Sequence, residues 1–216
     1  MEIETIVTVA VALAILTALV VSGGISAADQ YAVDHWMPLL DPTGGSSPAS
    51  VTEQFYPHLG GPLQTFCNLW TFPASIPVSG ALVGLCALAL ARRGQRTAGL
   101  AWVTAWIVAN AVEVIGKSVL HRPALHAVEA GSRVSFNTFA HSFPSGHALR
   151  ALIVAVVLAT VWRRATWPAA AWAGIALPLL VVNAAHTPSD VVGGALLAAL
   201  TLLLTRRILE LRAAAG

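Results

Sequence analysis

Six stretches of this sequence are long, apolar and almost free of charged side chains, and they constrain what the chain can fold into. A helix needs about 20 mostly apolar residues to cross a bilayer. Only 10% of the 216 residues are charged, whereas a soluble domain carries about 25%. We therefore predict an all-α, polytopic membrane protein that forms a single domain over residues 1–216. The predicted bundle has six transmembrane helices, at residues 5–22, 74–91, 98–116, 147–162, 168–185 and 190–205.

The arginines predict which way these helices point. By the positive-inside rule, basic segments next to transmembrane helices lie in the cytoplasm. Eight arginines follow the second, fourth and sixth helices, so both termini are predicted to be cytoplasmic. These residues are Arg92, Arg93, Arg96, Arg163, Arg164, Arg206, Arg207 and Arg212. The first helix begins with two glutamates and no basic residue, which favours a retained helix over a cleaved signal peptide.

The segment 29–73 has four acidic residues and no Lys or Arg. We predict that it forms a loop on the outer face of the plasma membrane, which in a bacterium is the inner membrane. Its aromatic side chains are predicted to anchor it at the membrane interface; they are Trp36, Phe55, Tyr56, Trp70 and Phe72. Cys67 lies outside an apolar stretch and Cys86 inside one, so no disulfide is expected between them.

Four basic residues are predicted to lie on the outer side, against the positive-inside rule: Lys117, Arg122, Arg133 and Arg150. The same face is predicted to collect three short polar stretches from distant parts of the chain. A shared site explains both observations, and it would lie within residues 113–190. The three stretches are "EVIGKSVLHRP" at 113–123, "SFPSGH" at 142–147 and "HTPSD" at 186–190.

The stretch "HTPSD" has the pattern of a helix start. Thr187 is suited to the N-cap and Pro188 to the first helical position, and Asp190 completes a Thr-x-x-Asp pattern like a capping box. Capping alone would account for Asp190 but not for His186. An imidazole whose Nδ1–H is held by Asp190 presents Nε2 as a nucleophile or a base. The alternative for His186 is an interfacial histidine bonded to water.

The stretch "PSGH" also predicts a helix start, after Pro144. Gly146 lets the backbone approach a ligand, and the free N–H groups of a first helical turn bind anions. Ser145 adds a hydroxyl, and His147 adds a group that can carry a proton. The alternative is an ordinary N-terminal cap.

The cations near these two stretches suit a bound phosphate. Lys and Arg hold phosphoryl oxygens, and Arg offers a fork of donors. Lys117 and Arg122 are the first candidates, and Arg150, one helical turn after His147, is a third. Glu113, four residues before Lys117, is predicted to pair with that lysine. The alternatives are snorkelling of the three cations to the interface and simple charge compensation by Glu113.

These residues resemble the type-2 phosphatidic acid phosphatase (PAP2) family of membrane lipid phosphatases, which share their site with vanadium haloperoxidases. "PSGH" at 144–147 matches one family motif completely, and "HTPSD" at 186–190 supplies the His-x-x-x-Asp pair of another. The resemblance covers residues 117–190. Two motifs depart from it. In the first, the family has Arg-Pro where this chain has Ala124 and Leu125, with Arg122-Pro123 two residues earlier. The family's Ser-Arg pair is replaced by Leu179 and Leu180.

The resemblance implies a phosphatase that acts on a lipid phosphomonoester or diphosphate, with no metal or cofactor. His186 would attack phosphorus to form a phosphohistidine, Asp190 would orient His186, and His147 would protonate the leaving oxygen. The substrate phosphate would be bound by Lys117, Arg122, Ser145 and Gly146, with Arg150 in place of the arginine that Leu180 replaces and Glu113 in support. The missing arginine also allows a weakly active or inactive member that binds lipid phosphate or transfers the phosphoryl group.

Two other function classes fit the sequence less well. An intramembrane serine protease would use Ser145 with His186, but such a serine lies deep in the membrane and needs no neighbouring cations. A transporter or channel needs polar residues at mid-bilayer, and Asn110 and Asn183 are the main ones in these stretches. The formal charge of +2 is too small to suggest a nucleic-acid partner.

Overall fold

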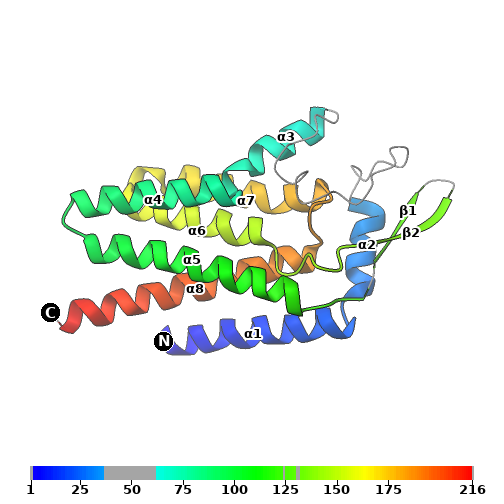
Figure 1. The fold of residues 1–216 in the computed structure, drawn as a ribbon, viewed down its shortest axis with the longest axis horizontal. Helices are drawn as coiled ribbons and strands as arrows, with labels where there is room; N and C mark the ends of the chain where they lie inside the picture. Colours follow the sequence, from blue (N-terminus) through cyan, green and yellow to red (C-terminus); the bar gives the residue numbers. More distant parts are fainter. Residues whose placement is uncertain (1, 37–61, 124, 130–131, 216) are drawn as a thin grey trace.

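Long helices lying side by side along one axis make up the body of the structure (Figure 1). The computed structural model describes residues 2–36, 62–123, 125–129 and 132–215. Each of the six predicted stretches is a helix. They are α1 (Glu2–Ser22), α4 (Ile76–Arg92), α5 (Arg96–Val119), α6 (Gly146–Val161), α7 (Thr166–Val182) and α8 (Pro188–Ala215).

The lengths and hydropathy of these helices confirm an integral membrane protein with a helical bundle. Four segments are long and apolar enough to cross a bilayer: 3–22, 96–119, 163–182 and 188–214. A fifth is reached when α4 is joined to residues 65–74, which contain most of α3 (Pro62–Thr71) and the short helix η2 (Phe72–Ala74), across a 43° bend. Helix α6 has only 16 residues, so the predicted count of six spans stays a prediction.

Helix α6 forms the centre of the bundle. Its buried residues Leu149, Ile153 and Val157 pack in one apolar cluster with side chains of α4, α5 and α8. Helix α1, by contrast, leaves Val7 and Ile15 more than half exposed. Lipid solvates such a surface as well as protein does, so packing rather than hydrophobicity decides which helix is central.

The two ends of the helical bundle carry different groups of residues. The start of α1 and the end of α8 lie at the same end of the bundle (Figure 1). The arginines between α4 and α5 and those after α6 belong to this end, where Arg93 Nη1 donates to the Val161 carbonyl at 2.6 Å. The three polar stretches of the sequence all lie at the opposite end, because α5 ends there and α6 and α8 begin there.

Short elements cover the polar end. The predicted loop 29–73 contains most of α2 (Ser26–Trp36) and all of α3, while Phe55 and Tyr56 lie outside the described residues. Trp36 is exposed at the end of α2. Trp70 is held by α7, because its Nε1 donates to the Trp172 carbonyl at 3.2 Å and Trp172 Nε1 donates to the Trp70 carbonyl at 2.9 Å. Cys67 and Cys86 are both free and buried.

A β-hairpin in this end departs from the all-α prediction. Strands β1 (Leu125–Glu129) and β2 (Ser132–Thr138) pair antiparallel, with Leu125 opposite Thr138. The sequences of the two strands carry the β-branched residues Val128 and Val134, which favour strands. The helical prediction therefore holds for the bundle but not for the connection between α5 and α6.

Candidate active site

The predicted capping box at the start of α8 is present. Asp190 Oδ2 accepts a hydrogen bond from the Thr187 N–H at 2.9 Å, and Thr187 Oγ1 accepts one from the Asp190 N–H at 3.4 Å. The same carboxylate faces His186, whose Nδ1 lies 3.8 Å from Asp190 Oδ2. Within the described part of the chain, this buried Nδ1 has no hydrogen-bond partner. Asp190 therefore caps the helix and also faces His186, and its predicted role in orienting His186 stays a prediction.

The "PSGH" stretch begins α6 and lies directly against α8. Ser145 is the N-cap of α6, since its Oγ accepts a hydrogen bond from the Ala148 N–H at 3.2 Å. Its own N–H donates to the Asp190 carbonyl at 2.9 Å, which ties the two helix starts together. This contact needs Gly194, because a Cβ at that position would collide with the Ser145 carbonyl oxygen.

These two helix starts bring the two predicted catalytic histidines together. The ring centroids of His147 and His186 are 6.1 Å apart, with an interplanar angle of 54°. His186 is buried and His147 is half-buried. The first N–H groups of α6, on Gly146 and His147, are not used by the helix itself. The pair thus lies next to backbone donors of the kind that bind an anion.

Glu113 lies between two cations beside the start of α6. Its Oε1 is 2.5 Å from Lys117 Nζ, which confirms the predicted i, i+4 pair. Its Oε2 is 3.6 Å from Arg150 Nη1. The carboxylate fits there because residue 146 is glycine: a Cβ would be 2.6 Å from Glu113 Oε1. Lys117 is 31% exposed, so it is the cation of this group that reaches the surface.

Arg150 is turned into the protein and does not snorkel. Its Nε donates to the Ala74 carbonyl at 2.6 Å, and its Nη1 donates to Asn110 Oδ1 at 3.0 Å. The side chain is 4% exposed. Arg150 therefore joins η2 and the start of α6 to α5, and its predicted contact with phosphate stays a prediction.

Arg122 is also buried, between two carboxylates. Its Nη1 lies 3.2 Å from Asp190 Oδ1, and its Nη2 lies 2.7 Å from Asp29 Oδ2. Nη1 also donates to Thr187 Oγ1 at 3.0 Å. The predicted binding of phosphate by Arg122 stays a prediction; the contacts observed for its guanidinium are with the first turn of α8 and with α2.

Asp29 and Ser189 belong to this network and were not predicted as site residues. Asp29 lies in α2, is 1% exposed, and accepts a hydrogen bond from the N–H of Ser189, 160 residues later in the chain. The one feature of the sequence that could have pointed to Asp29 is that it is an acidic residue in a segment without any Lys or Arg. That signal does not single out Asp29 from its exposed neighbour Asp34.

Leu180 fills the position where the resemblance leads us to expect an arginine. It is 2% exposed and packs with Val33, Ala148 and Val191. Its carbonyl accepts a hydrogen bond from the His186 N–H at 3.1 Å. The side chain thus supports the site by packing and supplies no charge.

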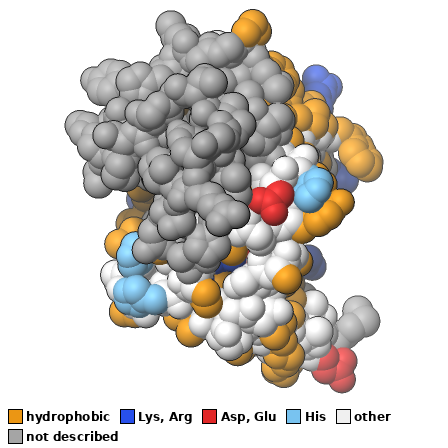
Figure 2. Space-filling model, turned by 90° about the vertical axis from the view of Figure 1, so that its right-hand side faces the viewer, with side chains coloured by type: hydrophobic (Ala, Val, Ile, Leu, Met, Phe, Trp, Pro, Cys, Tyr) orange, Lys and Arg blue, Asp and Glu red, His pale blue; other side chains and the backbone are white. Residues whose placement is uncertain are grey.

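Further polar side chains lie at this end of the bundle, outside the group of predicted site residues. Figure 2 looks onto it and shows charged and histidine side chains among apolar ones on the described part of the face. His121 and His141 stack edge-on with ring centroids 5.0 Å apart, and His141 Nδ1 is 3.2 Å from the Lys117 carbonyl. Over the described ranges, no three His, Cys, Asp or Glu side chains form a set that could hold a metal ion.

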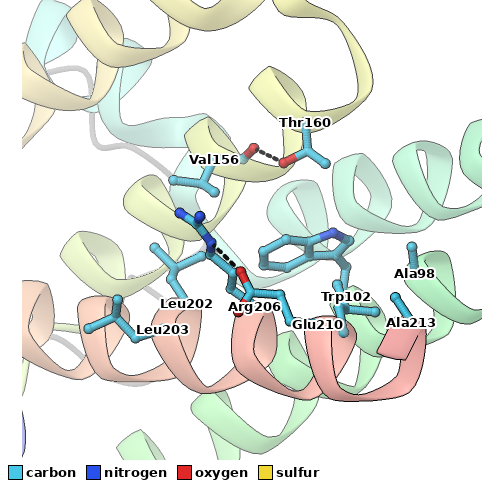
Figure 3. Close-up of a pocket in the computed structure, with 10 residues that line it drawn as sticks. Ala98, Trp102, Val156, Thr160, Leu202, Leu203, Arg206, Glu210 and Ala213 are labelled. Atoms are coloured by element: carbon cyan, nitrogen blue, oxygen red, sulfur yellow. Dashed lines mark hydrogen bonds and ion pairs between the residues drawn. The ribbon is translucent and has the colours of Figure 1, made fainter. Parts of the chain in front are cut away.

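A groove of about 610 Å³ lies at the other end of the bundle, between α5, α6 and α8 (Figure 3). Its lining is mostly apolar and includes Trp102, Val156 and Leu202. Arg206 and Glu210 form an ion pair there, with Nε and Oε1 3.0 Å apart. The groove contains none of the predicted site residues.

Comparisons with known proteins agree with this arrangement. A family model described as the PAP2 superfamily matches residues 98–213, more than half of the chain. The structure is similar to the crystal structure of the first transmembrane PAP2 type phosphatidylglycerolphosphate phosphatase from Bacillus subtilis. The TM-score is 0.67 at 18% sequence identity, and the match covers 95% of this chain and 96% of that one. A search of curated proteins found no match. The structural similarity establishes the fold, and the family model establishes the family.

Proposed function

The chain belongs to the PAP2 superfamily, and from this membership we propose that it is a membrane phosphatase for a lipid phosphate or diphosphate. The observation that carries the proposal is the pair His147 and His186, whose ring centroids are 6.1 Å apart. Asp190 Oδ2 lies 3.8 Å from Nδ1 of His186. The similar protein from Bacillus subtilis is described as a phosphatidylglycerolphosphate phosphatase, which supports a lipid substrate here.

We propose that the reaction has two steps. In the first, Nε2 of His186 attacks phosphorus, the bond from phosphorus to the leaving oxygen breaks, and His147 gives that oxygen a proton. In the second, His147 takes a proton from water, the water oxygen bonds to phosphorus, and the bond to His186 breaks. Asp190 Oδ2 lies 3.8 Å from Nδ1 of His186. We propose that it closes to hydrogen-bond distance of Nδ1–H during the reaction and stabilises the charged ring through both steps.

Charge on the transferred group is proposed to be balanced by Lys117 and by the N–H groups that begin α6. Positioning and charge stabilisation are the main help that a protein gives to phosphoryl transfer. Lys117 is the exposed cation, whereas Arg122 and Arg150 are 1% and 4% exposed and bound to acceptors of the protein. We therefore assign the two arginines first to holding Asp190 and Glu113, with phosphate contact as their predicted second role. Ser145 acts through its position as N-cap beside Gly146.

The proposed orientation in the membrane follows from the charge distribution. Six helices that alternate in direction, with both termini at the arginine-rich end, are supported by the positive-inside rule and by the arrangement in Figure 1. The site would then open on the outer face of the plasma membrane. A lipid head group would reach it from the outer surface, with the lipid chain between the helices.

The test is release of inorganic phosphate from lipid phosphates in detergent, with EDTA present. The panel contains phosphatidic acid, phosphatidylglycerol phosphate, a polyprenyl diphosphate and a phosphorylated polyprenyl sugar. We expect turnover of at least one substrate that EDTA leaves unchanged and that His186→Ala removes. Turnover that depends on added metal, or that survives in the His186 variant, would refute the proposal.

Leu180 supports a second candidate, a weakly active member that binds lipid phosphate or transfers the phosphoryl group. This position is part of an apolar cluster and supplies no cation. The same assay separates the two functions, because such a member would bind the lipids of the panel without releasing phosphate to water.

A further inference from the structure

We propose that Asp29 is a positioning residue for the reaction, acting on His186 through Arg122 and the first turn of α8. The inference rests on the proposed function, since it assigns a role within that site. It adds a residue from α2, which lies outside the family-matched residues 98–213.

Asp29 caps α8 from another helix. Its Oδ1 accepts a hydrogen bond from the Ser189 N–H at 3.1 Å, and its Oδ2 accepts one from Ser189 Oγ at 2.5 Å. A free N–H in the first turn of a helix needs an acceptor, and an anionic acceptor also interacts favourably with the helix dipole. The Asp29 side chain is 2% exposed, so water does not replace it in this role.

Arg122 connects Asp29 to the predicted catalytic carboxylate. One guanidinium, 1% exposed, bonds Asp29 through Nη2 at 2.7 Å and Asp190 through Nη1 at 3.2 Å. Two carboxylates therefore share one cation, and Asp190 keeps Oδ2 for the Thr187 N–H and for His186. Without Asp29, the full charge of Arg122 would act on Asp190 alone and draw it away from His186.

The neighbouring side chains hold α2 in place for this contact. Val33, one turn after Asp29 on α2, packs in the cluster that contains Ala148 of α6 and Leu180 of α7. A small displacement of Asp190 matters because misplacing a catalytic group by about 1 Å can lower the rate 10²-fold. The role of Asp29 is thus to fix the position of Asp190 without touching the substrate.

The experiment compares Asp29→Asn with Asp34→Asn in the full-length protein in detergent. Asp34 lies on the same helix, is exposed, and accepts a hydrogen bond from Gln30 Nε2 at 2.8 Å. For each variant, kcat and KM are measured with the best lipid of the panel, together with the inhibition constant of orthovanadate and the midpoint of thermal unfolding. Vanadate mimics the five-coordinate phosphorus of the transition state, so it reports geometry independently of lipid binding.

We expect Asp29→Asn to lower kcat and vanadate affinity by roughly ten-fold each, with KM within about two-fold of the wild type. Asp29→Glu should recover part of the loss, because it keeps the charge, and Asp34→Asn should match the wild type. If Asp29→Asn cannot be purified folded, the second variant is Ser189→Ala. It removes the Oγ contacts with Asp29, Arg122 and Thr187 but keeps the bond from the Ser189 N–H to Asp29, so it should show a smaller loss in the same direction.

Three outcomes overturn the inference. They are equal kcat for Asp29→Asn and Asp34→Asn, a loss that falls on KM alone, and a loss of activity that only follows a lower unfolding temperature. The proposed function fails separately, when the wild type releases no phosphate from any lipid of the panel. In that case vanadate affinity, measured by its effect on the unfolding temperature, still decides the role of Asp29.

Discussion

A methyl group at Gly194 is predicted to separate the two helix starts that carry the histidines. In Gly194→Ala the new Cβ would overlap the Ser145 carbonyl oxygen and would lie 3.1 Å from Ala148 Cβ. Cβ atoms essentially never approach another atom within 3.0 Å. Because the obstacle is backbone and not the end of a flexible side chain, α6 or α8 must move.

The size of the effect follows from what this contact holds together. The Ser145 N–H bonds the Asp190 carbonyl at 2.9 Å, so a shift of Ser145 also strains the link between "PSGH" and "HTPSD". A displacement on the order of 1 Å between His147 and His186 corresponds to a rate loss of up to about 10²-fold. The overpacked contact costs about 1–3 kcal/mol of stability, and the better helix propensity of alanine offsets up to about 1 kcal/mol of it.

The assay measures kcat on the best lipid substrate and thermal unfolding in detergent, with Gly174→Ala as control. Gly174 lies within α7, and among the described residues no atom beyond its own stretch of helix comes within 4 Å of a Cβ built there. The control is expected to keep wild-type kcat and to be slightly more stable. If Gly194→Ala retains kcat within about two-fold, the close contact between α6 and α8 does not position the histidines and this reasoning is wrong.

Two further predictions concern side chains of α6. His147→Ala should lower kcat most for substrates with a poor leaving group. It should have the least effect on an aryl phosphate whose phenol has a low pKa, because that group departs without a proton. Equal losses of kcat for both substrates would exclude the acid role. Arg150→Lys should lower kcat by roughly ten-fold, about 1.4 kcal/mol, because one ammonium cannot replace the Nε and Nη1 bonds to the Ala74 carbonyl and Asn110. Arg163→Lys, at the opposite end of the bundle, is the control, and an Arg150→Lys enzyme with normal kcat would contradict this role.

Features fixed by local spacing were predictable from the sequence. The capping box of Thr187 and Asp190, the Glu113–Lys117 pair and the six apolar helices all depend on residues within a few helical turns of each other. The positive-inside rule then placed "PSGH" and "HTPSD" on one face, and the structure brings His147 and His186 together there.

Contacts between distant segments were not predictable in the same way. Arg122 was predicted to bind phosphate from its charge and its place in the sequence. Its partner Asp29 lies 93 residues away, and nothing in the sequence links the two. Arg150 was expected to reach a ligand or the interface, and its Nε bonds a backbone carbonyl, which has no signature in a sequence. The pairing of β1 with β2 was not predicted, because two short strands give only a weak signal in a sequence dominated by long apolar stretches.

The central claim is that His186 becomes covalently phosphorylated, and trapping that intermediate tests it most directly. The wild type and His186→Ala are incubated briefly with a ³²P-labelled lipid phosphate and quenched without acid, since a phosphorus–nitrogen bond is acid-labile, and labelled peptides are identified by mass spectrometry. The account predicts label on His186 in the wild type and none in the variant, which should also lose turnover. Label that forms normally in the His186 variant, or that resides on another residue, would contradict it.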